Sequence, residues 1–176
     1  PDSFLVFEKK IKTLPLSYIS NKNDLLKKLY RIHLKFSFWL FRIKNDPPFS
    51  IEISKNEFSI EKNSKYLDYK LQHLHFKIKI EDFVLVLSFN RYLKIGFISD
   101  EQKNLKKIHK KLRYLAMFTG CHKIVYQKHC SMITKSIENS FNGFKQKKGL
   151  PFIVKSINGQ RDFPVLKIDF IDFDTF

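Results

Sequence analysis

The clearest pattern along the chain is a strict alternation of apolar and charged residues from Phe76 to Ile80, which predicts a strand with one buried and one solvated face. Every residue of Phe83–Leu87 is apolar, which is typical of a central strand covered on both faces. A third apolar run, Tyr92–Ile98, follows after Asn90-Arg91. The last two runs form either a tight hairpin or one long bent strand, and Gly96 marks a place where the backbone can approach another group closely.

Three segments show apolar residues at the three- and four-residue spacing of a helix. The first begins after a cap at Asn21 or Asn23, and the second runs over residues 100–119 with Gly120 as its end. The third runs from about Ser131 to Phe141 and is closed by Gly143. The recurring apolar positions of the first helix are Leu25, Leu26, Leu29, Ile32 and His33/Phe36, and those of the second are Leu105, Ile108, Leu112, Leu115 and Ala116.

Shorter strand signals complete the order of elements. They are Phe4–Phe7, a hairpin of Phe49–Ser54 with Phe58–Glu61, Lys123–Gln127, and two closing strands, Pro151–Ser156 and Pro164–Phe173, joined by Asn158-Gly159. The order predicts an α/β (α+β) fold with a single mixed, mostly antiparallel twisted sheet flanked by helices. We expect one domain over residues 1–176, either complete or a piece of a longer chain.

Composition narrows the class of protein. Hydrophobic residues make up 43% of the chain, enough for a core, so disorder throughout is excluded. Two cysteines cannot build a disulfide framework, which favours a reducing compartment. No signal peptide is visible, and no apolar run approaches the roughly 20 residues of a membrane-spanning helix. We therefore expect a cytoplasmic protein without a membrane partner, of unknown oligomeric state.

The pairs Cys121-His122 and His129-Cys130 suggest a zinc site. If Lys123–Gln127 is a strand, however, about 26 Å separate Cys121 from His129, whereas zinc holds its ligands within about 2.3 Å of one ion. We expect core thiols and surface histidines here, and no metal.

Charge is the strongest compositional signal, because 33 Lys and Arg oppose 17 Asp and Glu for a formal net charge of +16. Much of the excess lies on the helix over residues 103–113. Such a face can neutralise the phosphates of nucleic acid, or it can be the solvated side of an amphipathic helix. The sequence leaves both interpretations open.

The second half of the chain also has a recognisable order: strand Tyr92–Ile98, a long helix, strand Lys123–Gln127, a second helix, the dipeptide Gly143-Phe144 and two strands. Over about residues 83–176 this order resembles the GNAT superfamily of acyl-CoA-dependent N-acyltransferases. The resemblance implies transfer of an acyl group from acetyl-CoA or another acyl-CoA to an amine of a small molecule or peptide.

The resemblance also implies site residues. The strand before the long helix would lay its backbone against the pantetheine arm at Ile95, Gly96, Phe97 and Ile98, and the start of the helix would hold the pyrophosphate. Apart from the resemblance, Tyr126 and His122 carry side chains that can act as an acid or a base, and Tyr126 is the catalytic candidate. Cations for the phosphates would come from Lys106 and Lys107, with Lys110 as a further candidate.

Two departures from the family keep a second interpretation open. Ser99–Asn104 contains no glycine, and 138–141 contains no tyrosine. A catalytically degenerate member, or a non-catalytic basic module that binds nucleic acid or an acidic partner, therefore stands beside the enzyme.

Overall fold

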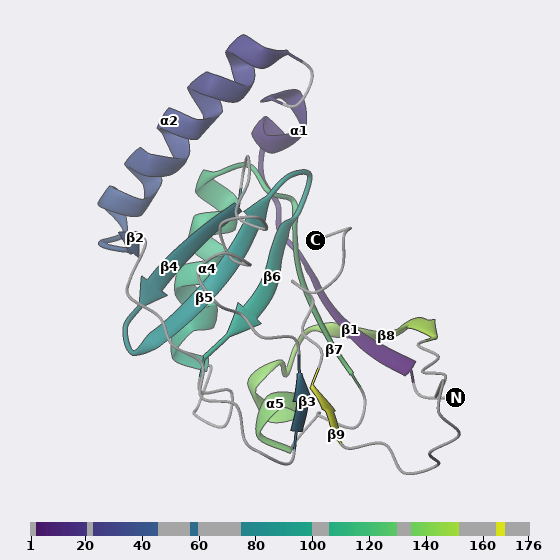
Figure 1. Cartoon of the computed structure of the whole chain (residues 1–176). Coiled ribbons are helices and arrows are strands. Elements are labelled where there is room, and N and C mark those ends of the chain that lie inside the picture. Colours follow the sequence, from purple (N-terminus) through teal and green to yellow (C-terminus); the bar gives the residue numbers. More distant parts are fainter. Residues whose placement is uncertain are drawn as a thin grey trace.

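The computed structural model describes residues 3–20, 23–45, 57–59, 75–99, 106–129, 135–151 and 165–167 (Figure 1). The helices are α1 (Leu16–Ser20), α2 (Asp24–Leu40), α4 (Lys106–Phe118) and α5 (Lys135–Ser140). The strands are β1 (Ser3–Lys10), β2 (Lys44–Asn45), β3 (Glu57–Ser59), β4 (His75–Ile80), β5 (Phe83–Phe89), β6 (Leu93–Ile98), β7 (Lys123–His129), β8 (Lys145–Pro151) and β9 (Val165–Lys167).

Seven of the described strands form one sheet in the order β2-β4-β5-β6-β7-β1-β8. Only β6 and β7 run parallel in it, and every other neighbouring pair is antiparallel. Strands β3 and β9 pair with each other in a separate small sheet. This arrangement confirms the predicted α+β class with a single mixed, mostly antiparallel main sheet. The open choice for β5 and β6 is resolved as a hairpin.

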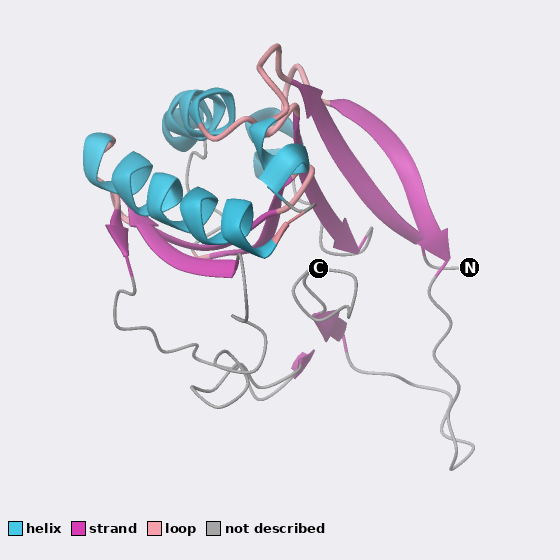
Figure 2. Ribbon diagram, turned by 90° about the horizontal axis from the view of Figure 1, so that it is seen from above, coloured by secondary structure: helices cyan, strands magenta, loops and turns pink. Residues whose placement is uncertain are grey.

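One row of side chains crosses the sheet and shows which face the helices cover. The strand pairings align Phe76, Leu87, Ile95, Tyr126 and Phe7 on neighbouring strands, and all five are buried. Helix α2 contacts one end of this row, and α4 and α5 lie near the other end. Figure 2 accordingly shows the long helices on the same side of the sheet.

The parallel pairing of β6 and β7 follows from their connection. Helix α4 links them as a crossover, which parallel neighbours require. Its predicted apolar stripe is confirmed at four positions, because Ile108, Leu112, Leu115 and Ala116 are all buried. The helix ends at Phe118, and Gly120 just beyond it has a φ of +73°, the left-handed conformation that glycine adopts at low cost.

Side chains from the start of the chain satisfy backbone carbonyls at the end of α4, where a helix leaves acceptors without internal partners. The Ser17 hydroxyl donates to the Gly120 carbonyl (2.9 Å), and the Tyr30 hydroxyl donates to the Thr119 carbonyl (2.8 Å). The His33 ring nitrogen Nε2 lies 3.0 Å from the Phe118 carbonyl. These contacts attach α1 and α2 to α4 across long sequence distances.

Helix α2 confirms one predicted cap and reveals a second apolar stripe. Asn23 caps it, since its side chain accepts a hydrogen bond from the Leu25 N–H at 2.8 Å. The residues that pack into the core are Tyr30, Leu34, Ser37 and Phe38. The apolar positions singled out in the sequence belong mainly to the opposite, outer face.

Three segments show the limits of the predicted strands. Strand β8 occupies a lysine-rich stretch that carries no strand pattern, and α1 is too short to give a helical period. Of the predicted hairpin strands, Phe58 and Ser59 belong to β3, which pairs with β9, while 49–54 and 60–61 lie outside the described residues. Of the predicted closing strands, 152–156, 164 and 168–173 also lie outside the described residues.

Candidate functional site

The parallel strands β6 and β7 stay together for only three residue pairs. These pairs are Leu93 with Ile124, Lys94 with Val125, and Ile95 with Tyr126. Both strands then continue for three more residues, to Ile98 and His129. Over that stretch β6 remains paired with β5 on its outer side, and β7 remains paired with β1. Within the described residues, the two inner edges therefore separate beyond Ile95 and Tyr126.

Gly96 lies at the point of separation. The register of β5 with β6 jumps there, from Leu87 opposite Ile95 to Val86 opposite Phe97, so Gly96 is the extra residue of a β-bulge. A bulge bends its strand and increases the local twist, which turns β6 away from β7. Ser99 then extends the contact with β5, since its N–H donates to the Val84 carbonyl and its hydroxyl accepts from the Val84 N–H, both at 2.8 Å.

Aromatic side chains fill the helix-covered side of this region. Tyr126 is 1% exposed and stacks on Phe141, with ring centroids 4.6 Å apart and planes at 8°. Phe7 lies on another side of it, at 6.2 Å, and His109 packs on Phe141 at 4.9 Å. The catalytic candidate Tyr126 is therefore a member of the core stack.

The other predicted site residues fall into two groups. Ile95, Gly96 and Ile98 are buried in β6, where the side chains of the two isoleucines belong to the core and the strand can offer its backbone. Phe97 lies in β6, and Lys106 and Lys107 lie in the first turn of α4, but the side chains of these three are outside the described part of the structure.

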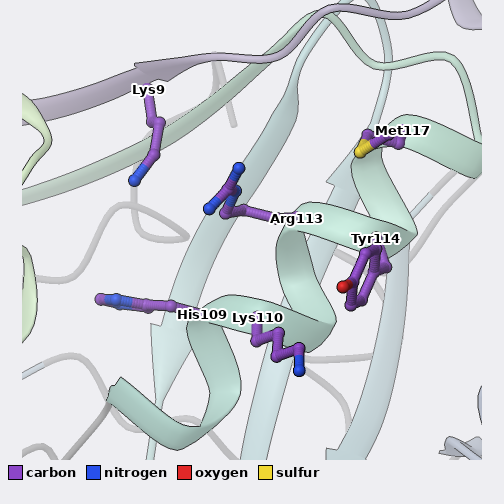
Figure 3. A pocket seen from close by; sticks show the side chains of 6 residues that line it. All are labelled: Lys9, His109, Lys110, Arg113, Tyr114 and Met117. Atoms are coloured by element: carbon purple, nitrogen blue, oxygen red, sulfur yellow. The ribbon is translucent and has the colours of Figure 1, made fainter.

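A groove of about 340 Å³ lies between the end of β1 and the exposed side of α4 (Figure 3). In Figure 3, Lys9, Arg113 and His109 point toward one shared space, while Lys110 and Tyr114 lie further round the helix. No acidic side chain is among the described residues that line it, so its charge is positive. We call it the cationic groove, and its lining residues are Lys9, His109, Lys110, Arg113, Tyr114 and Met117.

His109 is the most perturbed group in the cationic groove. Burial, together with the nearby charge of Lys9, lowers the pKa of its imidazole to about 4, so the ring is neutral at pH 7. Its Nε2 is buried and has no hydrogen-bond partner among the described residues. Phe144 packs on the ring at 5.2 Å, and the Lys9 ammonium lies 5.2 Å from the centroid of Phe144.

The sequence predicts a role for the lysines of α4 but does not indicate that Lys9 and His109 line a groove together with Arg113. His109 and Arg113 are four residues apart and therefore share a helix face, which the sequence does show. Lys9 comes from β1, about a hundred positions away, and only the pairing of β1 beside β7 brings it close.

A second set of charges gathers around Glu8 on β1. Glu8 accepts Lys147 at 2.9 Å and Lys123 at 3.4 Å. The hydrogen bond from Lys147, with the contributions of Lys123, lowers the pKa of the Glu8 carboxyl below its usual value against the opposing effect of burial. These two lysines, from β7 and β8, thus connect their strands to β1.

The Cys-His pairs are separated as the strand interpretation requires, because Lys123–His129 is the strand β7. Cys121 is buried near the Tyr30 hydroxyl, with 3.8 Å between Oη and Sγ, and burial raises the pKa of its thiol. Cys130 lies outside the described residues. In the described part of the chain no three His, Cys, Asp or Glu side chains gather as a metal site.

None of the helices in the described part of the chain combines the length and apolar character needed to cross a membrane.

Comparisons of the chain with models of known protein families, with curated proteins and with solved structures find no match.

Proposed function

We propose that this chain binds acyl-CoA between β6 and β7 and transfers the acyl group to an amine. The observation that carries the proposal is the end of parallel pairing at Ile95 and Tyr126 while both strands continue. The resemblance in element order over the second half of the chain supports the same site.

The physical basis is the hydrogen-bonding capacity of the two inner edges. Backbone N–H and C=O groups that leave a ladder need other partners. An extended ligand with amide groups, such as a pantetheine arm, can satisfy them as an added strand does. The bulge at Gly96 sets where the space begins, and Ser99 keeps the far end of β6 fixed to β5.

Bound acyl-CoA would supply a thioester, whose carbonyl carbon is attacked by the neutral amine. The new C–N bond forms as the C–S bond breaks, and the proton lost by the amine passes through solvent to the leaving thiolate. Backbone N–H groups of β6 beyond Ile95 would stabilise negative charge that develops on the carbonyl oxygen. Tyr126 is buried and packs on Phe7 and Phe141, and the proposal assigns it no proton-transfer step.

Isothermal titration calorimetry with CoA and with two of its fragments tests this site. We expect saturable binding of CoA, and competition by pantetheine, since the strand edges recognise its amides. Gly96→Val, which adds a branched side chain at the bulge, should weaken binding about tenfold or more. Lys44→Ala, on the far sheet edge in β2, is the matched control and should change nothing.

Two outcomes would contradict the proposal. If millimolar CoA gives no heat of binding, the proposed acyltransferase activity is ruled out. Competition by adenosine 3′,5′-bisphosphate without competition by pantetheine would mean that CoA binds in the cationic groove and not between the strands.

A second candidate function rests on the cationic groove itself. Its three cations and lack of an acidic lining residue favour the phosphates of a nucleic acid. Tyr114, at 47% exposure, adds an aromatic surface for a base.

For this candidate we expect the affinity for generic single-stranded RNA to fall steeply between about 50 and 200 mM salt. Arg113→Glu should weaken binding and reduce the slope of log affinity against log salt by about one or more, because a phosphate contact is lost. Fluorescence anisotropy of a labelled strand measures both quantities. The control Lys44→Glu makes the same change of charge on β2, so an equal loss in both variants would mean that net charge alone drives the binding.

A further inference from the structure

The outer face of α2 carries a row of large apolar side chains in contact with solvent. Leu25, Leu29, Ile32, Phe36 and Trp39 are 65, 54, 64, 50 and 72% exposed. They follow one another at intervals of four, three, four and three residues, which is the spacing of the a and d positions of a coiled coil. The row, here called the α2 stripe, is about 21 Å long at 1.5 Å per residue.

The α2 stripe is not needed to hold the helix on the fold. A different face of α2, with Tyr30, Leu34 and Phe38, makes the core contacts. Scattered apolar residues on a surface are ordinary, but a contiguous row of five marks an interaction site.

The two borders of the α2 stripe differ in chemistry. On one side lie the exposed cations Lys28, Arg31 and Lys35, of which Lys28 and Lys35 each precede an a-type residue and so occupy g-type positions. On the other side the stripe continues onto the end of α4, where Phe118 is 37% exposed and lies 6.4 Å from Phe36 between ring centroids. One border is therefore positive and the other apolar.

We propose that the α2 stripe is the docking surface for an acidic amphipathic helix of a partner protein. The apolar seam of such a helix would cover Leu25 to Trp39, and its carboxylates would face Lys28 and Lys35. Its other edge would rest on Phe118. Charge complementarity predicts that the partner is negatively charged, and the heptad spacing predicts that it is helical.

A second copy of this chain is a poor occupant. Asp24 is the only acidic residue of α2, so pairing two copies would place lysines beside lysines without carboxylates between them. A lipid surface would be matched better by cations on both borders, as in helices that lie flat in a membrane interface. Here the second border is the apolar end of α4.

The experiment uses Trp39, the only tryptophan of the chain, as a reporter at one end of the α2 stripe. The probe is a three-heptad synthetic peptide with Leu at its a and d positions and Glu at e and g. We expect a saturable blue shift of tryptophan emission as the peptide excludes water from the α2 stripe. Lys28→Glu/Lys35→Glu should weaken binding about tenfold or more, whereas Lys44→Glu should not.

A charge-swapped peptide, with Lys in place of Glu, is expected to bind the Lys28→Glu/Lys35→Glu variant better than it binds the natural chain. This rescue keeps the test independent of any loss of folding in the variant. The proposal is overturned if the acidic peptide produces no shift at millimolar concentration. It is equally overturned if emission shifts with protein concentration alone, which indicates a second copy, or only with phosphatidylserine vesicles, which indicates a lipid surface.

Discussion

Gly120→Ala is expected to lower the free energy of unfolding by about 3 kcal/mol, because it combines a left-handed backbone with a blocked position. A methyl group at Gly120 would lie 2.6 Å from the Cβ and backbone N of Leu16 and 2.7 Å from the Leu14 carbonyl oxygen. Two of these three atoms belong to the backbone, so α1 must move and the Ser17–Gly120 hydrogen bond is strained. Urea denaturation followed by circular dichroism measures the change.

Gly143→Ala is the matched control for this prediction. Gly143 has a similar φ of +83°, but among the described residues a methyl group there would meet only the Lys9 ammonium, at 3.7 Å. We expect a loss of about 1 kcal/mol, from the left-handed backbone alone. Equal losses in the two variants would show that the contact between α1 and the end of α4 is looser than the structure describes.

Elements with a long, regular pattern could be predicted from the sequence, and those held by distant pairing could not. The alternation in β4 and the uniform apolar run in β5 reflect their burial directly, and both strands are where the pattern predicts them. Strand β8 has mostly exposed lysines and forms because β1 offers it a free edge. Nothing in the local sequence of β8 records that edge.

Helix α2 shows how a correct pattern can indicate the wrong face. Its positions 25, 29, 32 and 36 have the spacing of a core stripe, yet they face solvent. The core stripe is displaced round the helix and includes two polar groups. The Ser37 hydroxyl donates to the His33 carbonyl, and the Tyr30 hydroxyl donates to a carbonyl at the end of α4. Periodicity identifies apolar faces, but the choice between two of them depends on tertiary contacts.

The candidate site could be predicted only in part. Gly96 was identified as a special position, and the structure gives it a physical role as the bulge at which β6 leaves β7. The phenol of Tyr126 makes it a candidate acid or base, but its alternation with Ile124 puts it on the buried face of β7. The cationic groove was missed because Lys9 reaches it through the position of β1 between β7 and β8.

His109 is expected to make the fold strongly dependent on pH between 6.5 and 4. In the folded chain burial, with Lys9, lowers the pKa of the imidazole to about 4 from its ordinary 6.5. As the pH falls through this window the unfolded chain takes up a proton and the folded chain does not. The contribution of His109 to the free energy of unfolding is therefore complete above pH 6.5. The free energy of unfolding should fall by about 3 kcal/mol between there and pH 4, at 1.36 kcal/mol for each pH unit.

His109→Phe tests the assignment, because the phenyl ring can keep the packing on Phe141 and Phe144 without a titrating group. The free energy of unfolding, measured by urea denaturation at several pH values, should fall less with acid in the variant than in the natural chain. Taking the difference between the two proteins removes the contribution of His122, whose pKa is also lowered, first by burial and then by Arg91 and Lys123. Parallel curves of unfolding free energy against pH for the two proteins would contradict the assignment. They would mean that the imidazole of His109 reaches solvent, and that water enters the space beside Lys9 and Arg113 although the His109 Nε2 is buried.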